Sequence, residues 1–431
     1  MKTYQILFLF LLLNVPITLF SQSKSIQSKA ALQEVAANQL DENLKTRLDK
    51  IDRMLNASIE RGDVPGLAVL IAKDGKIIYH TAKGKADVAS GKNMEKDAIF
   101  RIASQTKAIT STAVMILWEE GHFRLDDPIS KWIPEFKNPK VLQQFKYADT
   151  SYTSVAANKE ITIRHLLTHT SGLGYGMIDG DERMKMIYQK AGIVDLYTTE
   201  NTSIEENIKR LATLPLHHHP GEKFTYSEGL DVLGYFVEII SGKPFDKFLK
   251  ERIFDPLGME DTWFYLPENK QDRLVTVHKK ENGKWLRYSG TYYDADYPKT
   301  GAKRFFSGGA GLSSTAKDYA LFLQMYLNQG ELNGKRILSP LTVQTIMANQ
   351  IGDLWSGAKH YGLAFGVVTS TGVAEGGIGS EGTFDWGGYF NTQYFADPES
   401  KIIGILMKQT RDSPNEDTGW KFRQMVFSLV D

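Results

Sequence analysis

The feature that most constrains this sequence is a nearly uncharged stretch at residues 100–118, FRIASQTKAITSTAVMILW. From residue 102 to residue 118 the only charge is Lys107, and the apolar residues recur at nearly helical spacing. This pattern predicts a helix that is buried over most of its surface. Because lysines are seldom fully buried without partners, a lysine in that helix indicates a specific role.

Ser104 precedes Lys107 by three residues, so the hydroxyl and the amine share one face of the predicted helix. A lysine kept away from water can take the proton of a nearby hydroxyl and so create a nucleophile. Free N–H groups and the dipole at a helix start would stabilise the developing negative charge. The pair therefore predicts nucleophilic catalysis. The alternative is a structural lysine that extends from a core helix toward water.

The Ser-x-x-Lys pattern by itself is weak, because the chain contains it four times. The first copy lies in the N-terminal segment, the third is explained by a helix cap from Thr315 with Asp318, and the fourth has no helical period. Only the second copy leads into an apolar helix. The four copies begin at Ser21, Ser104, Ser314 and Ser356.

The composition narrows the classes of function. Lys plus Arg and Asp plus Glu both total 51, so the net charge is zero, whereas nucleic-acid binders usually carry a basic excess. The 431 residues include no cysteine, which excludes disulfides and a thiolate nucleophile. Phosphate-binding glycine loops and dinucleotide motifs do not occur, and the sequence implies no metal and no cofactor.

Residues 1–22 have the features of a secretory signal. A charge near the start is followed by an apolar run over residues 6–20 and by a small-residue exit at Ser21. A membrane anchor is the alternative, but Asn14 and Pro16 interrupt the run and no positive flank follows it. We therefore expect an exported protein, periplasmic or secreted, without membrane attachment after the signal is removed.

Strand-like segments occur near both ends of the chain, and helical segments occur in its middle. This order predicts an α/β (α+β) fold with one largely antiparallel sheet from both chain ends, flanked by helices, and a mostly helical second lobe. We expect a single domain over residues 23–431, with a site where the lobes meet. The sheet lobe is predicted at about 45–100 and 305–431, and the helical lobe at about 101–304.

Other segments of the middle region lack a catalytic pattern. Residues 139–160 predict an irregular surface insertion, and residues 175–202 predict a mobile flap. His165 and His169 are four apart, as in a zinc site, but the glutamate of the metalloprotease motif is missing, so we interpret both as structural. The run at residues 217–219 is three histidines before a proline and predicts a solvated loop.

Several stretches together resemble the serine β-lactamase and DD-peptidase superfamily, in its class C and family VIII carboxylesterase branch. The resemblance extends roughly from Leu44 to the C-terminus and implies a fold like that of penicillin-binding proteins. The stretches occur in the family's order: SQTK at Ser104, ITIRHLLTHTSGL at Ile161, PGEKFTYSEGLDVLG at Pro220, SGGAGLSST at Ser307, and WGGYFNTQYFADPESKIIGI at Trp386.

The resemblance assigns the family's second motif to residues 226–228, Tyr-Ser-Glu. The family tyrosine faces the serine and the lysine, which implies Ser104, Lys107 and Tyr226 as catalytic residues. A phenol beside an ammonium can act as base and then as acid, and a packing tyrosine is the alternative. Glu228 replaces the asparagine that helps class C β-lactamases hold a substrate amide. It is therefore a candidate substrate-binding residue that weakens the case for lactam and peptide substrates.

The third motif has two candidates. Residues 299–301, Lys-Thr-Gly, match the β-lactamase motif in letters but precede the glycine-rich loop that should come before it. Trp386, Gly387 and Gly388 have the expected context of a strand, a turn and another strand, and family VIII esterases resemble this sequence there. Tryptophan offers an apolar plane without the charge that attracts a carboxylate, which favours neutral acyl groups. The glycines let the backbone approach the substrate.

The resulting hypothesis is a serine hydrolase that cleaves small or medium carboxylic esters through an acyl-enzyme on Ser104. The resemblance implies that the N–H groups of Ser104 and Tyr389 form the oxyanion hole. A β-lactamase or D-amino-acid peptidase with the same site is one alternative, and a non-catalytic binding protein on this scaffold is another. The expected partner is a small molecule. The sequence does not predict the acyl chain, the alcohol or the oligomeric state.

Overall fold

The computed structural model describes residues 32–290, 293–376, 379–411, 413 and 416–430. The signal predicted at residues 1–22 lies outside the described residues, so it stays a prediction. Within the described ranges, every helix is too short or too polar to traverse a bilayer.

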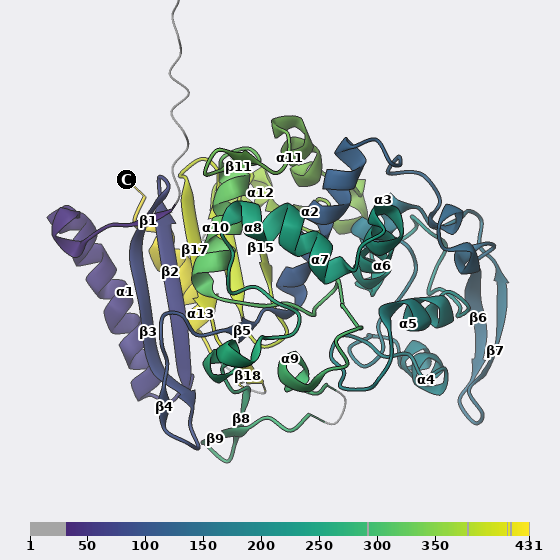
Figure 1. Cartoon of the computed structure of the whole chain (residues 1–431), viewed down its shortest axis with the longest axis horizontal. Helices are drawn as coiled ribbons and strands as arrows, with labels where there is room; N and C mark the ends of the chain where they lie inside the picture. Colours follow the sequence, from purple (N-terminus) through teal and green to yellow (C-terminus); the bar gives the residue numbers. More distant parts are fainter. Residues whose placement is uncertain (1–31, 291–292, 377–378, 412, 414–415, 431) are drawn as a thin grey trace, which may run out of the picture.

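The centre of the molecule is a nine-stranded sheet built from both ends of the chain (Figure 1). Neighbouring strands are antiparallel, except that β1 and β3 run parallel. The predicted fold class is therefore confirmed, while the lobe boundaries stay predictions. In spatial order the strands are β1 (Gln33–Glu34), β3 (Lys76–Asp87), β2 (Gly66–Lys73), β17 (Ile402–Met407), β16 (Gln393–Asp397), β15 (Phe384–Gly387), β14 (Gly366–Val368) and β13 (Lys359–Tyr361), with β4 (Lys92–Asn93) paired to β3.

Strand β2 is a continuous apolar run because both of its faces are buried. Alternate side chains enter two different hydrophobic clusters, as the two-residue period of a strand requires. Leu67, Val69 and Ile71 face one cluster, and Ala68 and Leu70 face the other. The turn into β3 uses Asp74 and Gly75, whose φ angles of 51° and 74° are typical of a tight hairpin.

Helices cover both faces of the sheet. On one face lie α1 (Glu42–Glu60) and α13 (Thr418–Phe427), which share a cluster with β2 and β17. On the other face lie α10 (Ala316–Leu327) and the predicted apolar helix α2 (Thr106–Glu119), in which every residue from 106 to 117 is buried. The helix predicted from the uncharged stretch is therefore confirmed, and it occupies the interior between the sheet and the second lobe (Figure 1).

The middle of the chain forms the second lobe around α6 (Gly229–Ser241), which packs on α2. Its other helices are α3 (Ile163–Leu167), α4 (Glu182–Lys190), α5 (Ile204–Leu211), α7 (Phe245–Leu249), α8 (Asp255–Leu257) and α9 (Tyr297–Thr300). Two more helices lie nearer the C-terminus, α11 (Pro340–Met347) and α12 (Ser370–Glu375).

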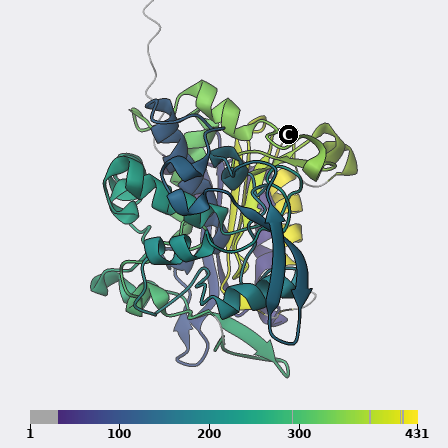
Figure 2. The same ribbon diagram turned by 90° about the vertical axis from the view of Figure 1, so that its right-hand side faces the viewer.

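The middle region also contains strands that were not predicted. The irregular insertion expected at residues 139–160 is wrong: β6 (Lys140–Lys146) and β7 (Ser151–Ala156) form an antiparallel hairpin, which lies in front in Figure 2. Most of its side chains are exposed or half-buried, so no apolar alternation marks it in the sequence. The remaining short strands are β5 (Phe100–Arg101) with β10 (Ser313–Ser314), β11 (Glu331–Leu332) with β12 (Lys335–Arg336), and β8 (His278–Glu281) with β9 (Lys284–Arg287) and β18 (Thr410–Arg411).

The segment at residues 175–202, predicted to be a mobile flap, is packed in part on the rest of the molecule, and its mobility stays a prediction. Tyr175, Tyr188 and Tyr197 are each 1% exposed, and α4 contributes Met184 to the main core. Large buried aromatic side chains anchor a segment firmly even when no regular period is visible. The weak periodicity therefore reflects irregular backbone around buried tyrosines.

Candidate active site

Ser104 lies in a short 3-10 turn, Ala103–Gln105, immediately before α2. It is half-buried in a stretch whose other side chains are buried, so its hydroxyl is the group that a small molecule can reach. Ala103 has a φ of +48°, a left-handed conformation that residues with a Cβ rarely adopt. Such strain is typically retained where the surrounding structure must hold a functional side chain in one orientation.

Lys107 is 0% exposed, which contradicts the alternative of a lysine that extends to water. Its Nζ lies 3.5 Å from Oγ of Ser104, 2.8 Å from Oη of Tyr175 and 2.8 Å from the carbonyl oxygen of Gly309. A protonated lysine has three N–H donors, so these three acceptors satisfy it completely. Among the described residues no carboxylate pairs directly with this amine.

Tyr226 lies beside the same amine, as the sequence predicted. The centre of its ring is 4.6 Å from Nζ of Lys107, and its Oη accepts a hydrogen bond of 3.3 Å from Nε1 of Trp386. The site is assembled from three parts of the chain. Ser104 and Lys107 come from the start of α2, Tyr226 comes from the loop before α6, and Trp386 comes from β15. The structure therefore brings together side chains that lie far apart in the sequence.

Tyr175 belongs to the site but was not singled out from the sequence. It contacts Lys107 directly, and its ring lies 5.5 Å from that of Tyr226. Burial raises its pKa well above the usual range, and the neighbouring Tyr226 adds to this effect. Its backbone N–H donates to Asp179 at 2.8 Å, which fixes the segment over the lysine. The only sequence signal was its place at the end of the THTSGLGY stretch, where no period or motif letter marks it.

The site has an accessible layer and a buried layer. Ser104, Tyr226, Trp386 and Tyr389 are half-buried, whereas Lys107 and Tyr175 are closed off behind them. Glu228 also belongs to the buried layer, since it is 1% exposed. Burial raises the pKa of its carboxyl well above the usual range, and nearby Asp195 and Asp231 raise it further. Its role in substrate binding stays a prediction.

The two glycines of the Trp-Gly-Gly sequence have different surroundings. A Cβ on Gly388 would lie 2.2 Å from Oγ1 of Thr392 and 2.5 Å from the carbonyl oxygen of Ile102. A Cβ on Gly387 would meet its nearest neighbour at 3.4 Å. Gly388 is therefore required by the close approach of β15 to the chain just before Ser104. Tyr389 directly follows this close approach, and the part of its N–H in an oxyanion hole stays a prediction.

The alternative Lys-Thr-Gly sequence does not lie on a sheet strand. Lys299 and Thr300 belong to the one-turn helix α9, and Gly301 follows it. Trp386 and Gly387 instead end β15, which is followed by a turn and by β16. The choice of the Trp-Gly-Gly sequence as the third motif therefore agrees with the fold.

The histidines have polar partners within the chain. Nδ1 of His165 accepts from the N–H of Thr162 in a capping box, and Nδ1 of His169 lies 3.1 Å from Oγ of Ser227. The solvated loop predicted for residues 217–219 is wrong for its first two members. Nε2 of His217 lies 2.9 Å from Oδ2 of Asp179, and His218 is 5% exposed. His217 is half-buried and contacts the segment that carries Tyr175, whereas His218 is buried and contacts Thr225.

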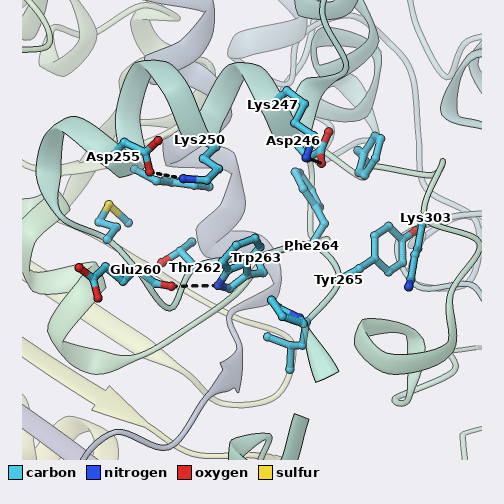
Figure 3. Close-up of a pocket in the computed structure, with 15 residues that line it drawn as sticks. Asp246, Lys247, Lys250, Asp255, Glu260, Thr262, Trp263, Phe264, Tyr265 and Lys303 are labelled. Atoms are coloured by element: carbon cyan, nitrogen blue, oxygen red, sulfur yellow. Dashed lines mark hydrogen bonds and ion pairs between the residues drawn. The ribbon is translucent and has the colours of Figure 1, made fainter. Parts of the chain in front are cut away.

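A separate cavity of about 400 Å³ lies between the α7–α8 region and residues 259–267 (Figure 3). Figure 3 shows Lys250 paired with Asp255 on the helical side and Trp263 bonded to Glu260 on the other. The residues that line it include apolar side chains and three residues of each charge. None of the predicted site residues lines it, so we assign it no part in the chemistry at Ser104.

Comparison with known proteins places this geometry in a family. Residues 51–425 match the Beta-lactamase family. The chain is 30% identical to Esterase EstB of Burkholderia gladioli over 383 residues, which covers 84% of this chain and 90% of EstB. It is 29% identical to the lovastatin esterase of Penicillium rubens, over 82% of this chain and 91% of that protein.

A solved structure has the same fold. EstCE1, described as a hydrolase with promiscuous acyltransferase activity, superposes with a TM-score of 0.77 at 26% identity and covers 90% of this chain and 100% of its own. The protein therefore belongs to the β-lactamase family. It is a serine hydrolase of the β-lactamase-fold superfamily, with esterases among its homologues.

Proposed function

We propose that this protein is an exported serine hydrolase that cleaves carboxylic esters through an acyl-enzyme on Ser104. The observation that carries the proposal is the fully buried Lys107, whose Nζ lies 3.5 Å from Oγ of Ser104 and contacts only uncharged groups. An amine with uncharged partners can exchange a proton with the hydroxyl without first breaking an ion pair.

The reaction follows from the arrangement of the side chains. Oγ of Ser104 attacks the ester carbonyl while its proton passes to Lys107 and Tyr226. The carbonyl oxygen gains the negative charge and is held by the N–H groups of Ser104 and Tyr389. The same proton then goes to the departing alkoxide. Water next attacks the acyl group, the bond to Oγ of Ser104 breaks, and a proton of the water returns to Oγ as the acid leaves. Nε1 of Trp386 donates to Oη of Tyr226, which helps this oxygen carry negative charge during the transfer.

The accessible layer favours an ester without a charged acyl group. Trp386 presents an indole where β-lactamases of this superfamily have a lysine, so an attraction for carboxylates is absent at this position. Behind the accessible layer, the ring of Tyr389 packs on two buried tyrosines, with ring centres 5.2 Å from Tyr293 and 6.5 Å from Tyr197. EstB and the lovastatin esterase are named as esterases, which supports the same class of substrate here.

A panel of nitrophenyl acyl esters tests the substrate class. Wild type should hydrolyse short and medium esters, while Ser104→Ala should show no turnover above the uncatalysed rate. The same preparations are assayed with a cephalosporin and with a D-Ala-D-Ala peptide. Cleavage of the peptide or the lactam without ester turnover would reject the esterase assignment. Failure of a fluorophosphonate probe to label Ser104 would favour a binding protein.

Export is tested separately from catalysis. The N-terminal sequence predicts a mature chain that begins near residue 23. Mass spectrometry of the protein recovered from its native cells should find this shortened N-terminus in the periplasm or medium. Recovery of the intact N-terminus in the membrane fraction would instead support an anchored form.

A further inference from the structure

The glycine-rich loop before β10, residues 307–312, has no part in the reaction described above. Its backbone nevertheless faces α2, because two successive carbonyl oxygens of the loop accept bonds from that helix. Oγ1 of Thr110 donates to Gly308 at 2.7 Å, and Nζ of Lys107 donates to Gly309 at 2.8 Å. The loop therefore supplies one of the three groups that hold the catalytic amine.

The opposite side of the same loop contacts a buried carboxylate. Asp231, on α6, is 2% exposed, and its Oδ1 accepts from the hydroxyl of Ser307 and from the N–H of Gly309 at 3.3 Å. Oγ of Ser307 accepts in turn from the N–H of Ala310 at 3.0 Å. This last N–H and the carbonyl of Gly309 belong to one peptide group.

These bonds form a continuous chain from Lys107 to Asp231. The amine donates to the Gly309 carbonyl, the Ala310 N–H donates to Ser307, and the Ser307 hydroxyl donates to the carboxylate. Each donor in this series points away from the ammonium of Lys107 and toward the carboxylate of Asp231. Aligned hydrogen bonds polarise and strengthen one another in a low-dielectric interior.

We propose that Asp231 is a positioning residue that holds Lys107 in its reactive place and stabilises its charge through Ser307 and the Gly309–Ala310 peptide. This inference rests on the proposed function, because it concerns the same lysine. This series of hydrogen bonds keeps the carboxylate of Asp231 out of direct contact with the amine of Lys107. Lys107 thus has a counter-charge at a distance, while the side of the amine that faces Ser104 has no carboxylate in contact with it.

Two glycines of the loop are required for this arrangement. A Cβ on Gly309 would lie 2.3 Å from Oδ2 of Asp231, and a Cβ on Gly308 would lie 2.2 Å from the carbonyl oxygen of Leu230. Both distances are shorter than a side chain permits, so only glycine lets the loop fit between α2 and α6. The need for a close approach explains the paired glycines of the SGGAG sequence.

Burial raises the pKa of the Asp231 carboxyl above its ordinary value of 3.8. The Ser307 hydroxyl, the Lys107 charge and the Gly309 N–H oppose this effect in part. Two donors on one oxygen favour the charged form. The other titratable groups that face Lys107 are His169 and Tyr175 from the loop after α3, and Tyr226 and Glu228 from the loop before α6.

The decisive measurement is the titration of Lys107 itself, followed by the 13Cε resonance in lysine-labelled full-length protein. Lys107→Met identifies the resonance by removing it. Asp231→Asn keeps the shape and an acceptor oxygen but removes the charge, and Ser307→Ala keeps the charge but breaks the chain. Asp318→Asn is the matched control, since Asp318 is also a buried helical carboxylate, 5% exposed, with two donors to one oxygen.

Loss of a nearby negative charge makes an ammonium easier to deprotonate. We expect the titration midpoint to fall by roughly one pH unit in Asp231→Asn and by about half a unit in Ser307→Ala, with no change in Asp318→Asn. The pH profile of fluorophosphonate labelling at Ser104 should move in the same direction.

An unchanged midpoint in Ser307→Ala would overturn the connection through the loop, even if Asp231→Asn did not fold. Equal shifts in Asp231→Asn and Asp318→Asn would show a general effect of stability and would also overturn it. The titration uses no substrate. A wild type without ester turnover would therefore reject the proposed function and leave the result on Asp231 intact.

Discussion

Two lysines of this chain are buried in different ways. Lys107 is 0% exposed and contacts a hydroxyl, a phenol and a backbone carbonyl. Lys408, just after β17, is 1% exposed and forms a direct ion pair with Glu416, whose side chain is 9% exposed. Burial lowers the pKa of Lys408, and the carboxylate of Glu416 opposes this effect. The comparison teaches that burial alone does not mark a reactive lysine, because the chemistry depends on its partners.

Replacement of each lysine by methionine tests most strongly whether the two buried lysines have different roles. Lys107→Met should reduce kcat/KM for a nitrophenyl ester by roughly 10³-fold or more, because Ser104 loses its base. Lys408→Met should leave the turnover number near that of wild type but lower the free energy of unfolding by about 3–5 kcal/mol, because Glu416 stays buried without its partner. Steady-state kinetics and urea denaturation measure the two effects. Equal losses of activity in Lys107→Met and Lys408→Met would contradict different roles for the two lysines.

The two tyrosines beside Lys107 sharpen the comparison, since one is proposed to transfer protons and the other to hold the amine. Tyr226→Phe should reduce kcat by about 10²–10⁴-fold, the usual size of a general acid–base contribution. Tyr175→Phe removes one hydrogen bond to the amine and should cost roughly tenfold. Both phenylalanines keep the ring packing and serve as controls for each other. A reversed order of the two losses would assign the proton transfer to Tyr175.

The oxyanion side of the site offers a matched pair of glycines. Gly388→Ala places a Cβ against the carbonyl of Ile102 and should displace the Tyr389 N–H, with a loss of about 10²-fold in kcat. Gly387→Ala has room for its methyl group and should stay near wild type. The measurement is kcat on one ester, with the melting temperature as a check on folding. Equal activity of the two variants would contradict a role for this close approach.

The smallest expected effect is the pH dependence of stability that comes from a buried carboxylate, Asp318. Burial raises the pKa of Asp318 to about 6 from its ordinary value of 3.8. Between these values the folded protein binds a proton that the unfolded chain does not, so this group stabilises the fold at low pH and its contribution is lost as the pH rises through 6. Relative to Asp318→Asn, wild type should lose up to about 1.4 kcal/mol of stability per pH unit between pH 4 and 6.

Urea unfolding of both proteins at pH 4, 5 and 6 measures that slope. A slope of the opposite sign would mean that Asp318 is ionised more easily in the folded state. The same variant is the control for Asp231→Asn, so the two experiments together separate the effects of buried charge on stability from those on Lys107.

Local pattern was sufficient to predict several elements. The uncharged stretch at residues 100–118 predicted α2, and the order of strand-like and helical segments predicted a sheet built from both chain ends. The hairpin β6–β7 could not be predicted in this way, because its side chains are mostly exposed or half-buried. The contacts of His217 with Asp179 and of the buried His218 with Thr225 were missed for a related reason, since these partners depend on how the chain packs.

The sequence by itself determined that a lysine would be buried one turn after Ser104, because helical periodicity acts between residues three and four apart. Only the tertiary structure decided what surrounds that lysine. Its partners Tyr175 and Gly309 lie 68 and 202 residues away along the chain. Contacts over such separations depend on how helices and loops pack, and no local pattern encodes them.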